Sequence, residues 1–179
     1  TAVVTGGARG IGRGIALSLA GAGADVVVGD LDGAADPLDA EERERVDGAG
    51  GSIDVRRADV TDDADVDRLV GAAADRFGGL DVLVNNAGVT HDGTIEETSE
   101  AEWHRVMDVN LTGVYRCTRR AIPLLRESEA PRVVNVASQL GLVARPRRPA
   151  YCASKGGGVN RSEERRVGKE GRSRGAPYH

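Results

Sequence analysis

The sequence predicts an α/β protein in which a parallel sheet carries helices on both faces. Short runs rich in β-branched residues alternate with longer amphipathic stretches along residues 2–136. Strands that alternate with helices in this way form β-α-β units, whose parallel strands are covered on both sides. No internal repeat or long linker interrupts the alternation, so we expect a single domain over residues 1–160.

The first part of the chain predicts three strands and two helices. The strands are residues 2–5 (AVVT), residues 25–29 (DVVVG) and a weaker run at residues 53–57. Residues 10–22 predict the first helix, because apolar side chains recur along it. Residues 38–49 combine helix formers with charges, and the two glycines that follow them predict a stop.

The later part of the chain continues the same alternation. Residues 63–77 predict a helix that ends at a glycine pair, and residues 82–84 predict a fourth strand. A long helix is expected over residues 100–125, followed by a fifth strand at residues 132–136. The side chains expected to face the core are Val66, Leu69, Val70 and Ala73 on the first of these helices and Trp103, Val106, Val109 and Val114 on the second.

Composition argues against several functional classes. The net charge is -4 and aromatic residues make up 3% of the chain, which argues against a nucleic-acid surface or a base-stacking platform. No apolar run is long enough for a membrane span and no signal peptide begins the sequence, so we expect a cytoplasmic protein. The two cysteines form no CxxC or cysteine–histidine group, which predicts reduced thiols and no metal site.

A glycine-rich turn, TGGARGIG over residues 5–12, lies between the first strand and the first helix. Glycines at this place let the backbone bend sharply and approach a pyrophosphate, whose charge then lies at the positive end of the helix. The spacing is GxxxGxG and not the GxGxxG of the common dinucleotide fingerprint. A plain glycine-rich turn is therefore the alternative interpretation.

Two charged residues bear on the choice of cofactor. A carboxylate that ends the second strand can accept hydrogen bonds from adenosine ribose hydroxyls and repel a 2′-phosphate, and Asp30 stands there. Arg9, inside the glycine turn, favours the opposite choice, because a guanidinium can bind a 2′-phosphate. We predict NAD, with NADP as the alternative. A solvated loop acid is the structural alternative for Asp30.

Tyr151 and Lys155 stand one helical turn apart in the segment YCASK. On a helix such positions share a face, so the phenol of Tyr151 and the ammonium of Lys155 can approach one cofactor together. A phenol has a pKa near 10 and is a poor base at neutral pH, but a neighbouring cation favours the phenolate. A tyrosine–lysine pair with this spacing is common, and by itself it means little.

Taken together, these segments resemble the short-chain dehydrogenase/reductase family. The resemblance runs in order through the TGGARGIG turn, Asp59-Val60, Asn85-Asn86-Ala87-Gly88, Asn110, Ser138 and YCASK. It implies a Rossmann-type doubly wound sheet with strand order 3-2-1-4-5. It also implies reversible hydride transfer between NAD(P)(H) and an alcohol or ketone substrate, in a homodimer or homotetramer.

The resemblance implies a role for each matched position. Tyr151 would act as general acid/base, and Lys155 would lower the pKa of the tyrosine and bind the nicotinamide ribose. Ser138 would orient the reacting oxygen, and Asn110 would hold a water in a proton relay that ends at Lys155. The expected cofactor contacts are Gly6, Arg9, Gly10, Ile11 and Gly12 along the pyrophosphate and nearby ribose, Asp59 and Val60 beside the adenine, and Asn86, Ala87 and Gly88 between the cofactor and the sheet.

Some of these residues have structural alternatives. Ser138 could serve as a helix cap or turn hydroxyl, and Asp59 could simply end a strand. Asn110 begins an N-x-T sequon, which matters only in a secreted protein. For the whole chain the alternatives are a dinucleotide-binding regulatory or scaffold protein without turnover, and an inactive truncated fragment.

The sequence departs from the family pattern after Lys155. Gly156-Gly157-Gly158 follow at once, each costing a helix about 1 kcal/mol relative to alanine. Residues 161–179 are basic and lack periodicity, so we expect a disordered tail, which resembles a vector- or adaptor-derived translation. If the last third of the family fold is missing, the fifth strand becomes an uncovered edge and activity is low.

The segment over residues 139–150 carries three arginines, Arg145, Arg147 and Arg148. They could attract an acidic substrate, or they could simply form an exposed basic loop. The sequence does not identify the substrate.

Overall fold

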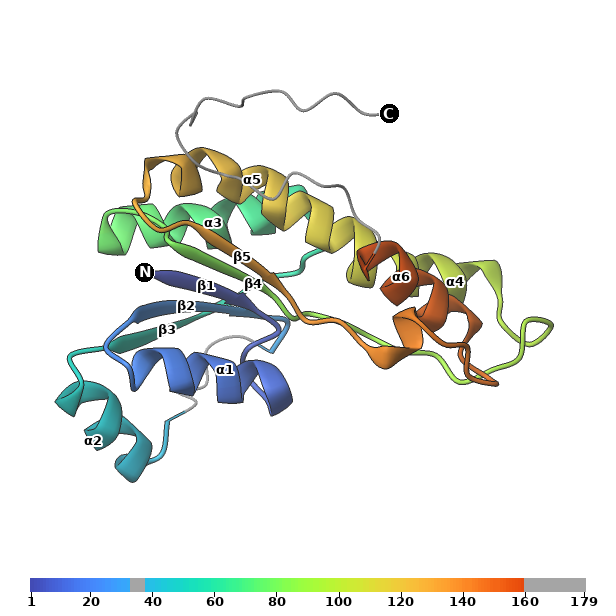
Figure 1. Ribbon diagram of the computed structural model, residues 1–179, viewed down its shortest axis with the longest axis horizontal. Helices are drawn as coiled ribbons and strands as arrows, with labels where there is room; N and C mark the ends of the chain where they lie inside the picture. Colours follow the sequence, from blue (N-terminus) through green and yellow to red (C-terminus); the bar gives the residue numbers. More distant parts are fainter. Residues whose placement is uncertain (33–37, 160–179) are drawn as a thin grey trace, which may run out of the picture.

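The computed structural model describes residues 1–32 and 38–159, which form a sheet with helices on both faces (Figure 1). The expected strand order is confirmed: five parallel strands lie in the order β3-β2-β1-β4-β5. The strands are β1 (Ala2–Thr5), β2 (Asp25–Asp30), β3 (Ser52–Arg57), β4 (Val82–Asn85) and β5 (Arg132–Asn135).

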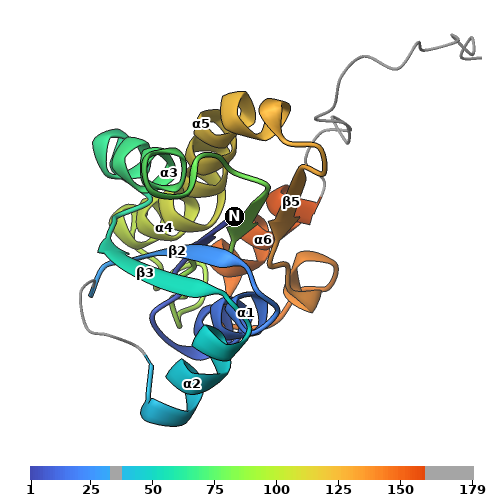
Figure 2. The same ribbon diagram turned by 90° about the vertical axis from the view of Figure 1, so that its left-hand side faces the viewer.

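The helices lie in three groups. Helices α3 (Asp63–Phe77) and α5 (Gly113–Glu127) cover one face of the sheet, and α1 (Gly10–Ala20) covers the other with α2 (Ala40–Gly48) beside it (Figures 1 and 2). Helices α4 (Glu100–Met107) and α6 (Pro149–Val159) pack against each other beyond the carboxyl ends of β4 and β5 (Figure 1). Within residues 1–32 and 38–159, every helix is too short or too polar to traverse a lipid bilayer.

The sheet separates two apolar clusters, because successive side chains of a strand point to opposite faces. Val3 of β1 packs toward α3 and α5, whereas its neighbour Val4 packs toward α1. The four side chains expected to face the core from residues 63–77 are all buried against the first of these faces. Cys117 of α5 lies in the same cluster, and burial raises the pKa of its thiol to about 12.

Helix ends follow ordinary capping chemistry at three of the helices. The side chains of Asp39, Asp62 and Ser99 each accept a backbone N–H from the first turn of α2, α3 and α4, respectively. At its other end α3 stops at Gly78, which adopts a φ of 82°, a conformation that favours glycine. These residues explain why the sequence located both ends of α3 correctly.

The expected single helix over residues 100–125 is wrong in one respect. A five-residue π-helix, Asp108–Thr112, separates α4 from α5. Val106 is buried as expected, but Trp103, Val109 and Val114 are only half-buried. The fully buried apolar side chains of α5 are Cys117, Ala121 and Leu125.

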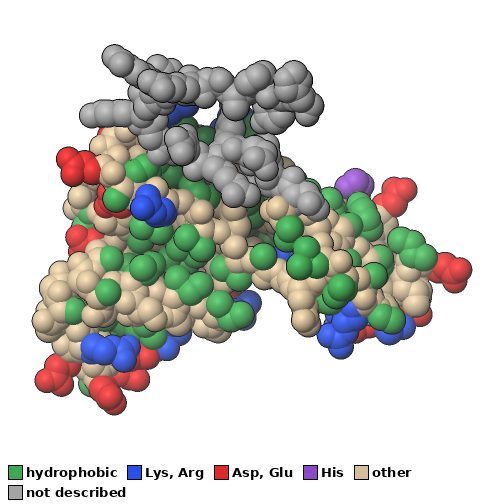
Figure 3. Space-filling view, viewed as in Figure 1, with side chains coloured by type: hydrophobic (Ala, Val, Ile, Leu, Met, Phe, Trp, Pro, Cys, Tyr) green, Lys and Arg blue, Asp and Glu red, His purple; other side chains and the backbone are tan. Residues whose placement is uncertain are grey.

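The chain after β5 leads into the helix that carries Tyr151 and Lys155. Helix α6 continues through Gly156-Gly157-Gly158 to Val159 and does not stop at them. The expected disordered tail, residues 161–179, lies outside the described residues. Within the described part of the chain, β5 forms an edge of the sheet and its Val134 is 47% exposed. Figure 3 shows hydrophobic side chains exposed on the face of the molecule that carries β5.

Candidate active site

A cleft of about 660 Å³ opens at the carboxyl ends of the strands. It lies where the strand order reverses, between β1 and β4, which is the usual ligand site in open α/β sheets. Of the predicted site residues, those that line it are Gly6, Arg9, Ile11, Gly12, Asp30, Asp59, Val60, Asn86, Ala87, Gly88, Ser138, Tyr151 and Lys155. Gly10 and Asn110 do not line it.

The glycine turn forms one wall of the cleft, and its close contacts require glycine. Gly6 and Gly10 have φ values of 63° and 57°, in the left-handed region. A Cβ atom on Gly12 would lie 2.2 Å from the carbonyl oxygen of Gly6 and 2.3 Å from Nδ2 of Asn86. The turn therefore brings α1 against the end of β1 more closely than any side chain would allow.

Asn86 fixes this turn to the end of β4. Its Nδ2 donates to the carbonyl oxygens of Thr5 and Gly6, at 2.9 and 2.7 Å. In return, the hydroxyl of Thr5 accepts the backbone N–H groups of Asn86 and Ala87, at 3.1 and 3.0 Å. Thr5 begins the glycine-rich turn but was not among the expected site residues.

The amino end of α1 faces the cleft without a cap. Its first turn holds no acidic residue, and the side chain of Arg9, at the N-cap position, makes no capping hydrogen bond. Helices α2, α3 and α4 instead have both a side-chain cap and acids in the first turn. An uncapped helix N-terminus presents free N–H groups and positive potential, which fits the pyrophosphate of a dinucleotide.

Asp30 and Arg9 differ sharply in exposure. Oδ2 of Asp30 accepts the backbone N–H of Ala8 at 3.0 Å, and the residue is only 8% exposed at the cleft wall. The side chain of Arg9 is 82% exposed and lies 3.8 Å from Asp32. The carboxylate is thus held in place by the glycine turn, whereas the guanidinium reaches into solvent.

Asp59 and Val60 line the cleft beside the end of β3. The backbone N–H of Asp59 donates to Oδ2 of Asp65 at 2.9 Å. That hydrogen bond, together with the guanidinium groups of Arg68 and Arg57, lowers the pKa of the Asp65 carboxyl. Asp65 was not among the expected site residues, because an acid in the first turn of a helix is ordinary in itself.

Tyr151 and Lys155 lie on one face of α6 and line the same cleft as the glycine turn. Nζ of Lys155 is 5.8 Å from the centre of the Tyr151 ring. The same atom donates to the carbonyl oxygen of Val136 at 2.8 Å, and burial lowers the pKa of the ammonium. Helical spacing therefore brings the two groups together as expected.

Ser138 lies at the cleft after β5, and its hydroxyl has a structural role as well. Oγ of Ser138 accepts the backbone N–H of Leu140 at 3.2 Å, at the start of a short 3₁₀ helix, Gln139–Gly141. The expected alternative of a capping hydroxyl is therefore observed. The side chain also lines the cleft, so the two roles coexist.

Asn110 lies in the π-helix and is buried behind the cleft wall. Its Oδ1 accepts the N–H of Val89 at 2.8 Å, and its Nδ2 donates to the carbonyl of Val89 at 2.9 Å and to Oγ of Ser154 at 3.0 Å. Ser154, which sequence analysis did not select, donates in turn to the carbonyl of Tyr151 at 2.8 Å. Asn110 thus joins the segment after β4 to the helix that carries Tyr151.

Nine further residues line the cleft, and of these the sequence indicated only Arg148, as one of three arginines that could attract an acidic substrate. Eight are uncharged, and the ninth, Arg148, adds a cation beside Tyr151. They are Leu31, Ala58, Val89, Thr90, Val109, Val136, Ala137, Leu140 and Arg148.

Comparison with known proteins gives one consistent family. Residues 1–167 match a family model described as short chain dehydrogenase, a range that runs past residue 160, the expected end of the domain. D-beta-hydroxybutyrate dehydrogenase of Cupriavidus necator is 40% identical over 88% of this chain and 60% of its own length. A 3-oxoacyl-[acyl-carrier-protein] reductase of Synechocystis is 38% identical over 97% of this chain and 69% of its own length.

A solved structure is similar as well. A Sinorhizobium meliloti protein described as a short-chain alcohol dehydrogenase superposes with a TM-score of 0.78 and 36% identity, over 89% of this chain and 63% of that one. The chain therefore spans about 60% of the length of the first of these relatives.

Proposed function

Because the chain belongs to the short-chain dehydrogenase/reductase family, a family of oxidoreductases, we propose that it transfers a hydride between NAD(P)(H) and an alcohol or carbonyl substrate. One observation carries the proposal. Tyr151 and Lys155 share a helix face and line the same cleft as the glycine turn and the uncapped end of α1. The relatives are longer than this chain, so catalysis by residues 1–179 alone is itself a proposal.

The residues that line the cleft around the glycine turn and the ends of β2 and β3 fit the cofactor. The close approach of Gly6 and Gly12 leaves room for a pyrophosphate at the amino end of α1. Asp30 would accept the adenosine ribose hydroxyls, and Asp59 and Val60 would flank the adenine. Gly10 would contribute through its backbone conformation, since it does not line the cleft.

Other predicted contacts would complete the cofactor site. Arg9 and Ile11 would lie along the pyrophosphate and the adjacent ribose, and Asn86, Ala87 and Gly88 would support the cofactor from the end of β4. We propose NAD as the preferred cofactor, because the fixed carboxylate of Asp30 would repel a 2′-phosphate. NADP is the alternative, and Arg9 is the residue that favours it.

The bound nicotinamide supplies or accepts the hydride, and the protein handles the proton. Tyr151 would give its hydroxyl proton to the substrate oxygen during reduction and recover it during oxidation. The hydroxyl of Ser138 would hold that oxygen in place. Lys155 donates one N–H to the carbonyl of Val136, and the described residues accept neither of the other two, which would reach the nicotinamide ribose. Its charge favours the phenolate.

We propose that Asn110 acts mainly by positioning α6, and its relay water remains a prediction. Both Nδ2 hydrogens of Asn110 are already donated, to the carbonyl of Val89 and to Ser154. A water held by this residue would therefore bind to one of its oxygen atoms.

The names of the relatives suggest substrates to test first. Both a beta-hydroxybutyrate dehydrogenase and a 3-oxoacyl reductase act on an oxygen at the third carbon of an acyl chain. We propose 3-oxo and 3-hydroxy acyl compounds as the first panel. A homodimer or homotetramer, a cytoplasmic location, and the division into a domain (residues 1–160) and a tail (residues 161–179) also remain predictions.

A single substitution tests the proposed function. In Tyr151→Phe, the affinity for NADH should be unchanged while kcat falls by about 10²-fold or more, since the general acid is removed. NADH binding is measured by fluorescence titration and turnover by absorbance. Equal turnover in the variant would overturn the role of Tyr151. Tight NADH binding without turnover by the unmodified chain, across the panel, would favour the regulatory alternative.

A further inference from the structure

One charged residue of the cleft has no part in the proposed hydride transfer. Arg9, Asp30 and Asp59 belong to the cofactor half of the cleft, and Lys155 stands beside Tyr151. Arg148 also lines the cleft, one helical turn before Tyr151, and its carbonyl oxygen accepts the N–H of Cys152 in the first turn of α6. The structure therefore places a guanidinium at the substrate end of the cleft.

The guanidinium of Arg148 is held in place through one of its nitrogen atoms, Nη1. Its Nη1 lies 2.7 Å from Oδ2 of Asp92 and donates to the carbonyl of His91 at 3.0 Å. The side chain is only 23% exposed. An arginine anchored in this way loses little conformational entropy when it binds a ligand.

The rest of the guanidinium is available to a ligand. All the hydrogen bonds of the Arg148 side chain leave from Nη1, so among the described residues none accepts from its Nε or Nη2. A carboxylate binds best to two parallel N–H groups of this kind. Asp92 offsets only part of the charge, because it is shared with Arg147 at 2.6 Å.

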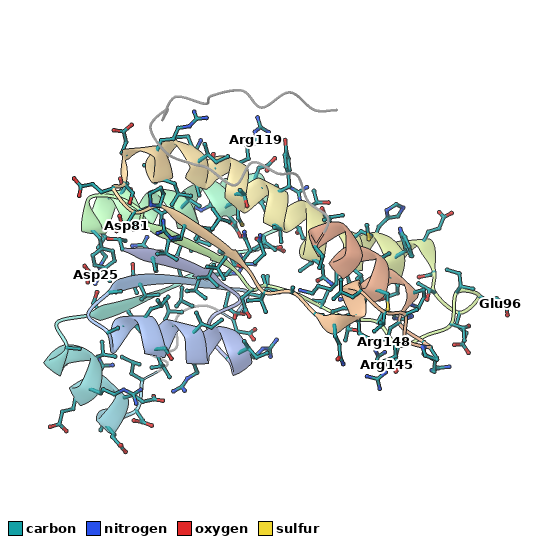
Figure 4. All side chains as sticks on the ribbon, in the orientation of Figure 1. Asp25, Asp81, Glu96, Arg119, Arg145 and Arg148 are labelled. Carbon is teal, nitrogen blue, oxygen red and sulfur yellow. The ribbon has the colours of Figure 1, made fainter. Side chains whose placement is uncertain are left out.

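The two neighbouring arginines are arranged differently. Arg147 is 52% exposed, does not line the cleft, and pairs with both Asp92 and Glu97. Arg145 is exposed and likewise does not line the cleft. Figure 4 shows Arg145 and Arg148 close together near α6, far from Asp25 and Asp81 at the other end of the sheet. The basic loop expected from sequence thus has one member that is built into the site.

We propose that Arg148 binds a carboxylate of the substrate and makes the enzyme selective for oxo and hydroxy acids over their neutral analogues. The inference rests on the proposed function and adds the substrate class to it. Because Arg148 and Tyr151 are one helical turn apart, the carboxylate would lie within a few bonds of the reacting carbon. The guanidinium would orient the acid while Tyr151 exchanges the proton.

The test compares each acid with its own methyl ester. The chain over residues 1–179 is assayed with 2-, 3- and 4-oxo acids and their methyl esters, in the presence of NADH and then NADPH. The variants are Arg148→Met, Arg148→Lys and, as a matched control from the same loop, Arg145→Met. In Arg148→Met, KM for the preferred acid should rise by about ten-fold or more with little change in kcat, whereas the ester should be unaffected. Arg148→Lys should recover part of the loss, and Arg145→Met should behave as the unmodified chain.

A binding measurement separates this inference from the proposed function. Butanoate, which cannot be reduced, is titrated calorimetrically into the protein with NADH present. Binding that Arg148→Met abolishes and Arg145→Met retains supports the carboxylate site, even if no substrate turns over. Three results would overturn the carboxylate site. They are absence of butanoate binding, an equal rise in KM for acid and ester in Arg148→Met, and a preference of the unmodified chain for the esters. Thermal melting and NADH titration of Arg148→Met verify that the variant is folded.

Discussion

Asn110 in the π-helix donates a 3.0 Å hydrogen bond to the hydroxyl of Ser154 on α6, and both side chains are buried. Ser154 in turn donates to the carbonyl of Tyr151, so the orientation of α6 depends on a residue that does not touch the cleft. Asn110 also accepts from and donates to the backbone of Val89. One amide therefore joins three segments around the site.

Replacing Asn110 with alanine should lower the free energy of unfolding by about 1–3 kcal/mol, because several buried polar groups lose their partner. Ser154→Ala removes one of these hydrogen bonds and should cost less. Urea unfolding monitored by circular dichroism measures both. Equal effects of the two substitutions would show that the contacts with Val89 contribute nothing.

Two glycines of α1 should respond oppositely to alanine. In Gly12→Ala the new Cβ would overlap the carbonyl of Gly6 and the amide of Asn86, so we expect destabilisation of about 1–3 kcal/mol and loss of NADH binding. A Cβ on Gly14 would meet nothing within 4 Å, so Gly14→Ala should stabilise the helix by up to about 1 kcal/mol. Thermal melts and NADH titration measure the pair. Normal NADH binding by Gly12→Ala would argue against a pyrophosphate at this turn.

Asp65 should make stability depend on pH in acid. The backbone N–H of Asp59 and then the guanidinium groups of Arg68 and Arg57 hold its pKa below the ordinary value of 3.8, so the carboxylate stabilises the fold above that value. The stabilisation should be lost as the pH falls through the lowered pKa. The free energies of unfolding of the unmodified chain and of Asp65→Asn should therefore differ most at neutral pH and converge in acid. Asp75→Asn, at an exposed position on the same helix, is the control. A difference between Asp65→Asn and the unmodified chain that persists unchanged into acid would contradict the prediction.

Asp30→Asn tests the choice of cofactor. The amide can still accept from the N–H of Ala8 and from ribose hydroxyls, but it no longer repels a 2′-phosphate. The ratio of kcat/KM for NAD over NADP should fall by about ten-fold or more. Asp47→Asn, at an exposed carboxylate that does not line the cleft, should leave the ratio unchanged. An unchanged ratio in Asp30→Asn would remove the argument for NAD.

The sequence predicted the sheet well because its strands are short apolar runs with glycines or acids at their ends. Helix α3 matches its expected range of residues 63–77, since a capping aspartate and a left-handed glycine mark its two ends. The stretch after Glu100 could not be predicted in the same way. The π-helix adds a residue to one turn, so a single helical period drawn through residues 100–125 assigns Trp103 and Val114 to a core that they only partly enter.

The residues of the candidate site that belong to a sequence motif could be predicted. Those that only support the site through hydrogen bonds could not. Gly6, Gly12 and the Tyr151–Lys155 pair belong to motifs whose order along the chain resembles the family, and the structure brings them to one cleft. Asp65 supports that cleft by accepting the N–H of Asp59, and Ser154 supports it by linking Asn110 to the carbonyl of Tyr151. Nothing in the local sequence distinguishes such an aspartate or serine from an ordinary helix residue.

The thiols of Cys117 and Cys152 differ in their accessibility to alkylating reagents. The high pKa of Cys117 leaves almost no thiolate at neutral pH, and the residue is 1% exposed, so alkylating reagents should not modify it in the native protein. Cys152 is half-buried and follows Tyr151 directly in the chain. A maleimide dye would therefore attach at Cys152, on the helix that carries Tyr151, without any engineered cysteine.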